Sequence, residues 1–156
     1  MKDLPKLFIS VIGCELVGFL GTPFTISAIP TWYATLKKPF FAPPNWIFGP
    51  VWTLLYLLMG VAFYLIWKQG WKKKKVKTAG MFFLAQLGLN FLWSPIFFGL
   101  RVPLLGLIVI VAMWVLIVMT MKKFYPLSRL AFYLLVPYLL WVSFATLLNA
   151  AIMVLN

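Results

Sequence analysis

Five stretches of this chain are long enough and apolar enough to cross a lipid bilayer as helices. The hydrocarbon core takes roughly 20 residues of α-helix to cross. Helices satisfy their own backbone hydrogen bonds at that depth, and none of the stretches shows the alternation of a membrane barrel strand. The sequence therefore predicts an all-α membrane protein, a single domain (residues 1–156) with one bundle of five transmembrane helices. The expected helices cover residues 7–29, 46–67, 79–100, 102–121 and 130–155.

The composition agrees with this fold and argues against most conventional catalytic chemistry. Hydrophobic residues make up 64% of the chain and charged residues 10%, and the mean hydropathy is +1.01. Without His and with one Cys, Cys14, the chain cannot form a Ser-His-Asp triad, a His-ligated metal or haem site, or an internal disulfide. Its two acids, Asp3 and Glu15, are too far apart in the chain to suggest a paired-carboxylate site. We therefore expect neither a hydrolase, kinase or metalloenzyme nor a bound cofactor.

The basic residues lie mainly between the apolar spans, where such residues set membrane topology. The net charge of +12 would suggest a nucleic-acid partner in a soluble chain, but here these residues face phospholipid head groups, and we expect no nucleic acid. One side of the predicted bundle carries most of them: Lys2, Lys6, Lys68, Lys72, Lys73, Lys74, Lys75, Lys77, Lys122, Lys123 and Arg129. The other side carries Lys37, Lys38 and Arg101. This asymmetry predicts an N-terminus inside and a C-terminus outside, and we expect a bacterial plasma membrane.

The first span has a second interpretation, a secretory signal peptide. Lys2 and Lys6 precede its apolar run, and Thr25-Ile26-Ser27 is a weak match to a cleavage site. Against this, the run is long for a signal peptide and contains Glu15. We therefore expect the first span to stay in the protein as a helix.

The segment between the first two spans, residues 30–45, is too rich in proline and aromatic residues to be a simple linker. Prolines reduce the entropy lost on ordering, and aromatic side chains suit a membrane interface or a lid. The segment is therefore expected to be ordered and to fold over part of the bundle, with Asn45 as the N-cap of the second helix. Pro95 and Pro137 are expected to kink the third and fifth helices.

Polar residues inside the spans indicate which helix faces point into the bundle, because a polar side chain facing lipid is costly. On the third span one face carries Gln86, Asn90, Trp93, Ser94 and Phe97. The opposite face carries Gly80, Leu84 and Gly88 and could pack closely against another helix, in the bundle or across a dimer.

Two more spans show faces of the same kind. The fifth span has Tyr138, Trp141, Ala145 and Asn149 on one face, and the second has an aromatic stripe of Trp52, Tyr56, Phe63 and Trp67 beside Gly60. Each face taken alone is compatible with ordinary helix packing. Three such faces directed at one point predict a cavity for a flat hydrophobic ligand.

Glu15 is the only charged residue inside any span. A lone carboxylate at membrane depth costs on the order of 2–3 kcal/mol and marks a candidate functional site. The alternatives are a neutral Glu that is hydrogen-bonded to a neighbouring helix and one that reaches the interface. A membrane Glu in a first helix is also found in small multidrug-resistance exporters, so a proton-coupled exporter of lipophilic cations is an alternative function. Cys14 is expected to be a packing residue.

Several motifs, in the same order, resemble the translocator protein family (TspO/MBR, or tryptophan-rich sensory proteins), in its bacterial type. They span almost the whole chain. They are the run from Trp32 to Pro44, Pro50-Val51-Trp52, Leu55-Tyr56, Met59-Gly60, the run from Asn90 to Gly99, Pro137-Tyr138-Leu139-Leu140-Trp141 and Leu148-Asn149.

The resemblance implies a five-helix membrane protein, often a homodimer, that binds porphyrins such as protoporphyrin IX and synthetic benzodiazepine and isoquinoline-carboxamide ligands. Such a protein acts in tetrapyrrole handling or stress sensing, as a receptor in contact with membrane lipids. By matching motifs, the pocket would consist of Tyr33, Pro43, Trp52, Tyr56, Asn90, Trp93, Ser94, Phe97, Trp141 and Ala145. In bacterial relatives a light-dependent breakdown of porphyrin is attributed to tryptophans that match Trp52 and Trp141, which makes these two residues the candidate catalytic groups.

Two departures from the pattern of animal members bear on ligand choice. The C-terminal segment, residues 149–156, lacks the aromatic and basic residues of the sterol pattern, so sterol binding there is not expected. Leu104-Leu105 occupies a place where animal members have a pocket tryptophan, which predicts a different affinity for the synthetic ligands.

Overall fold

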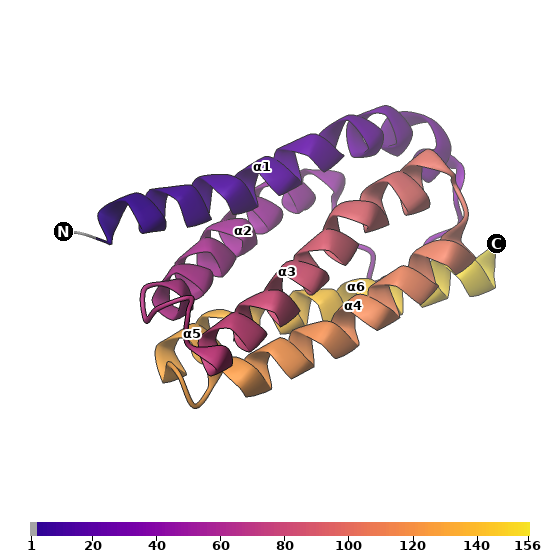
Figure 1. Cartoon of the computed structure of the whole chain (residues 1–156). Helices are drawn as coiled ribbons and strands as arrows, with labels where there is room; N and C mark the ends of the chain where they lie inside the picture. The colour runs from indigo at the N-terminus through magenta and orange to yellow at the C-terminus, as the bar shows by residue number, and fades with distance from the viewer. Residues whose placement is uncertain (1–2) are drawn as a thin grey trace.

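A computed structural model describes residues 3–156, and every regular element in this range is helical (Figure 1). Lys2, counted above among the residues that set topology, lies outside the described residues. The α-helices are α1 (Leu4–Ala28), α2 (Asn45–Trp67), α3 (Lys74–Ser94), α4 (Pro103–Phe124), α5 (Arg129–Leu134) and α6 (Val136–Leu155). Two short π-helical segments, η1 (Ile29–Tyr33) and η2 (Pro95–Gly99), extend α1 and α3.

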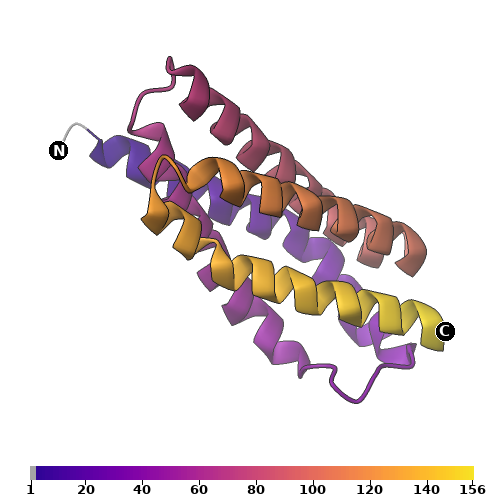
Figure 2. The same ribbon diagram turned by 90° about the horizontal axis from the view of Figure 1, so that it is seen from below.

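These elements form five helical units that are long and apolar enough to span a membrane, as predicted. Helix α1 packs on α2 and α3, and α4 packs between α3 and α6 (Figure 2). The start of α1 lies at the same end of the bundle as the α2–α3 and α4–α5 connections, and the C-terminus lies at the other end (Figure 1). Helix α3 begins at Lys74, five residues before the predicted span, because lysine stems can follow a helix beyond the apolar layer.

Both predicted proline kinks are present. Helix α3 gives way to η2 at Pro95, and the fifth unit breaks at Leu135, two residues before Pro137. The first unit differs from the prediction, because Pro30 and Tyr33 belong to η1 rather than to the loop. The expected Asn45 cap is also wrong, since Asn45 is the first residue of α2 and no side chain caps this helix.

The loop after η1 is held against the C-terminal end of α6. The backbone N–H of Lys37 donates to Oδ1 of Asn156 over 3.1 Å, and Nδ2 of Asn156 donates to the carbonyl of Lys37 over 2.9 Å. The Phe41 ring meets the Phe144 ring edge-on, with 5.9 Å between centroids. The ordered loop predicted from its prolines is therefore anchored to the last helix.

Helices α1 and α2 cross in close contact at Gly60. The Ser10 hydroxyl donates to the Gly60 carbonyl over 2.6 Å, and a Cβ atom at Gly60 would come 2.6 Å from the Val11 Cα. This crossing divides the predicted aromatic stripe of α2: Trp52 and Tyr56 face one cavity, whereas Phe63 and Trp67 line a separate groove. The prediction that the whole stripe points to one site is therefore wrong for Phe63 and Trp67.

The small-residue face of α3 is also divided. Gly80 is buried because the Trp71 ring lies directly on it. Leu84 is 44% exposed, and Gly88 has no neighbouring side chain within 4 Å of its Cβ position. The smooth outer face of α3 therefore begins at Leu84, and Gly80 does not belong to it.

Candidate ligand-binding cavity

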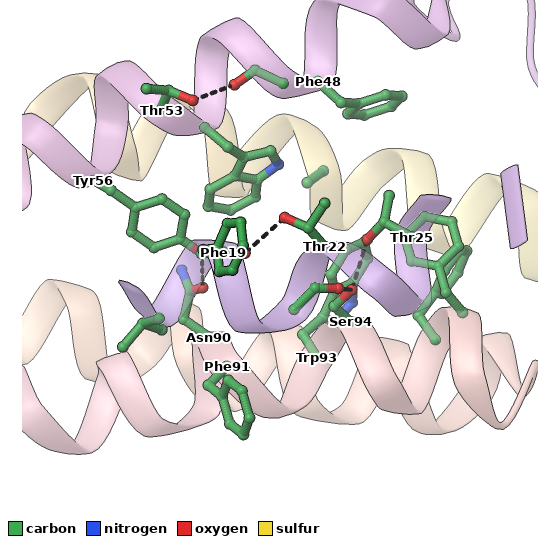
Figure 3. Close-up of a pocket in the computed structure, with 18 of the residues that line it drawn as sticks. Phe19, Thr22, Thr25, Phe48, Thr53, Tyr56, Asn90, Phe91, Trp93 and Ser94 are labelled. Atoms are coloured by element: carbon green, nitrogen blue, oxygen red, sulfur yellow. Dashed lines mark hydrogen bonds between the residues drawn. The ribbon is translucent and has the colours of Figure 1, made fainter. Parts of the chain in front are cut away.

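A cavity of about 830 Å³ lies between α1, α2, α3 and α6, with α4 contributing to its wall (Figure 3). This volume is within the range of pockets that enclose small organic molecules. Aromatic side chains from four helical units line it, among them Phe19, Tyr33, Phe48, Trp52, Tyr56, Trp93, Phe97 and Trp141.

The structure brings together nearly all of the binding residues inferred from the sequence. The cavity is lined by Tyr33, Trp52, Tyr56, Asn90, Trp93, Ser94, Phe97, Trp141 and Ala145. Pro43 is the exception, because it lies in the loop beyond η1 and is not part of the lining. The two candidate catalytic residues, Trp52 and Trp141, line the cavity from α2 and α6.

The π-helical turn after α3 places a stacked aromatic pair in the wall. Trp93 and Phe97 have 5.0 Å between ring centroids and an angle of 15° between ring planes. The Trp93 Nε1–H donates to Oδ1 of Asn149 over 3.2 Å, and Nδ2 of Asn149 donates to the carbonyl of Pro103 over 2.9 Å. These bonds connect α3, α6 and the start of α4, so the stacked pair is held in a defined orientation.

A chain of buried hydrogen bonds connects the cavity with the core. The Tyr56 hydroxyl donates to Oδ1 of Asn90, whose Nδ2 donates to the Tyr138 hydroxyl over 2.8 Å. Tyr138 in turn donates to Oε1 of Gln86 over 2.6 Å. Gln86 and Tyr138 were predicted on the inward faces of their helices, but they lie behind the cavity wall and are absent from its lining.

Helix α1 supplies a further wall of the cavity, in addition to Glu15. Thr25 and Ser94 share a hydrogen bond of 2.8 Å between their hydroxyls, and Ser94 also donates to the Gly21 carbonyl over 3.2 Å (Figure 3). Phe19 and Thr22 face the cavity on the turn before. The signal for this wall was present in the sequence, because Thr22 and Thr25 are polar residues three apart within an apolar span.

Two hydrogen-bond donors in the lining have no partner among the described residues: the Tyr33 hydroxyl and the Trp141 Nε1–H. Tyr33 is only 2% exposed, so water does not reach it freely. A buried donor without a partner is costly. Among the described lining residues, these two donors are buried without a protein partner.

The cavity opens sideways between α1 and α2. We define this lateral opening by the exposed residues of the lining, which are Ile12, Leu16, Phe19 and Ile26 on α1 and Asn45, Trp46, Gly49 and Thr53 on α2. The lining residues from α3, η2, α4 and α6 are buried or half-buried. The exposed residues of the lateral opening belong to two of the membrane-spanning units, the first and the second.

Comparison with known proteins identifies relatives over the full length of the chain. Residues 10–155 match the family model described as the TspO/MBR family. The tryptophan-rich protein TspO of Archaeoglobus fulgidus is 49% identical over 155 residues, covering 99% of both chains. The protein of the same name from Chlorobaculum tepidum is 46% identical over 155 residues, covering 99% of this chain and 98% of the relative. The human translocator protein is 41% identical over 140 residues, covering 88% of this chain and 80% of the relative.

Proposed function

This chain belongs to the TspO/MBR family, and we propose that it is a membrane receptor that binds porphyrins such as protoporphyrin IX and other flat hydrophobic ligands in its aromatic cavity. Its family and its five apolar helices make it an integral membrane protein. We propose that it acts in tetrapyrrole handling or stress sensing.

The observation that carries the proposal is the aromatic lining of the cavity, within which two buried donors have no protein partner. A porphyrin offers a wide apolar face for the rings, and its carboxylates offer acceptors for the Tyr33 hydroxyl and the Trp141 Nε1–H. The stacked rings of Trp93 and Phe97 provide a flat apolar surface that suits the flat apolar face of a porphyrin. The lateral opening supports the proposal further, since a hydrophobic ligand concentrates in the bilayer.

Replacing Tyr33 or Trp141 with phenylalanine is expected to weaken protoporphyrin binding about tenfold, because each change removes one donor to a charged acceptor. The measurement is quenching of tryptophan fluorescence by protoporphyrin IX, titrated in the dark with the protein in lipid nanodiscs. Tyr64→Phe and Trp67→Phe serve as matched controls, since neither residue lines the cavity, and both should bind like the wild type. Absence of saturable quenching in the wild type would refute the proposed function.

A second candidate function, light-dependent breakdown of the bound porphyrin, is favoured by the position of Trp52 and Trp141 in the same cavity wall. A bound porphyrin absorbs light, and electron-rich indoles beside it can donate electrons. At saturating porphyrin and under illumination, we expect porphyrin absorbance to fall no faster with the double variant Trp52→Phe/Trp141→Phe than with protein-free nanodiscs. If the double variant bleaches porphyrin as fast as wild type and Trp67→Phe do, these two indoles have no catalytic role.

Two further features remain proposals. We propose that the end of the bundle with the α2–α3 and α4–α5 connections faces the cytoplasm of a bacterial cell, because its lysines follow the positive-inside rule.

We also propose that the protein forms a homodimer, for which the exposed face of α3 at Leu84 and Gly88 offers a smooth surface.

A further inference from the structure

Glu15 differs from every other residue of the cavity lining. Among the described residues it is the only charged side chain there, and it lies on α1 in a largely aromatic and aliphatic wall. One helical turn further along α1, Gly18 lies directly against the Tyr56 ring, and Phe19 follows on the same face. The Glu15 carboxylate is therefore placed beside aromatic rings of the cavity.

The polar groups around the cavity are otherwise committed to one another. Asn90 is bonded to Tyr56 and Tyr138, and Ser94 is bonded to Gly21 and Thr25. Thr22 and Thr53 donate to carbonyls of their own helices. Glu15 takes part in none of these bonds, so they do not explain why a carboxylate occupies this position.

The position of Glu15 relative to the lateral opening suggests its role. Ile12, Leu16 and Phe19, which precede or follow Glu15 on α1, are 55%, 52% and 71% exposed, whereas Glu15 itself is half-buried. Glu15 therefore lies between the exposed residues of α1 and the lining of the cavity. A molecule that enters between α1 and α2 passes it.

We propose that Glu15 recognises the protonated amine of a cationic amphiphile that enters the cavity from the lipid layer. A carboxylate in apolar surroundings gains most from a neighbouring cation, and the rings of Tyr56 and Phe19 attract the same cation through their π-faces. No other charged side chain of the described residues lines the cavity, so Glu15 alone supplies a local preference for a cation. The inference rests on the proposed function, because the apolar body of the amphiphile would occupy the same aromatic cavity.

The test uses two probes with the same pyrene body, 1-pyrenemethylamine and its uncharged N-acetyl derivative. Both accept excitation energy from tryptophan, so binding to the protein in zwitterionic nanodiscs can be titrated against empty nanodiscs. Glu15→Gln is expected to weaken binding of the amine about tenfold and to leave the N-acetyl probe unchanged. Glu15→Asp, which keeps the charge, should retain the preference for the amine. Asp3→Asn removes the other acid of the chain, outside the cavity, and should bind both probes like the wild type.

Equal binding of the amine by wild type and Glu15→Gln would overturn the proposal, and so would an equal loss for both probes, which would indicate a structural role. Protoporphyrin binding by the wild type is titrated in parallel, as the readout of the proposed function. Saturable porphyrin binding without any effect of Glu15 on the amine would refute only this inference. Lack of saturable porphyrin binding by the wild type would refute the proposed function, whereas an amine preference that depends on Glu15 would still support this inference.

Discussion

Replacing Gly60 with alanine is expected to lower the free energy of unfolding by about 2–3 kcal/mol. The added Cβ would lie 2.6 Å from the Val11 Cα and 3.0 Å from its backbone nitrogen. Because both atoms belong to the backbone of α1, no side-chain rotation can relieve the contact, and the two helices must move apart. That movement would also lengthen the buried bond from Ser10 to the Gly60 carbonyl.

Gly13→Ala, on α1 itself, is the matched control for this prediction. Its Cβ would meet nothing within 4 Å, and alanine has the higher helix propensity. Its free energy of unfolding should therefore change by less than about 1 kcal/mol, in the stabilising direction. Both values can be measured by equilibrium unfolding in mixed micelles with a denaturing detergent. Equal stability of Gly60→Ala and the wild type would show that the crossing of α1 and α2 is not closely packed at this point.

The second large effect is expected for Tyr138→Phe, which should lower the free energy of unfolding by about 2–4 kcal/mol. Tyr138 is 0% exposed, and its hydroxyl joins Nδ2 of Asn90 to Oε1 of Gln86. Without the hydroxyl, one buried donor and one buried acceptor lose their partners. Nε2 of Gln86 already lacks a partner among the described residues, so Gln86 cannot easily compensate by turning.

Tyr133→Phe provides the control, because Tyr133 lies on the neighbouring helix α5 and is 58% exposed. The same unfolding measurement should show almost no change for it. The consequence for ligand binding also distinguishes the two variants. Tyr138 fixes Asn90, which lines the cavity, so Tyr138→Phe should weaken porphyrin binding and Tyr133→Phe should not. Wild-type stability of Tyr138→Phe would contradict the role given to this hydrogen-bond chain.

Much of the cavity could be predicted from helix periodicity combined with the family motifs. The residues expected on the inner faces of the third and fifth spans, such as Asn90, Trp93 and Trp141, do line it. Periodicity succeeds for these residues because a polar or indole side chain facing lipid is costly, so its direction is strongly constrained. The proline kinks were predictable for a similarly local reason, because proline removes a backbone donor wherever it occurs in a helix.

Other parts of the site depended on where helices cross. The aromatic stripe of α2 is continuous in sequence, yet Phe63 and Trp67 are separated from the cavity by the contact between Ser10 and Gly60. Periodicity specifies the direction of a side chain but not the point at which a neighbouring helix passes. For the same reason Gly80 could not be distinguished from Gly88 until Trp71 was seen to cover it. Pro43 matched a family motif, but its distance from the lining depends on the path of the loop.

The sequence by itself determined a five-helix membrane protein, because apolar spans of this length can satisfy their backbone only as helices. Its motifs indicated the TspO/MBR family. The sequence also indicated which faces of α3 and α6 point inward. The tertiary structure decided the rest: the division of the α2 stripe at Gly60, the wall from α1, the unpartnered donors of Tyr33 and Trp141, and the lateral opening beside Glu15. These features depend on how closely two helices approach each other, which is set by side chains distant in sequence and not by any local pattern.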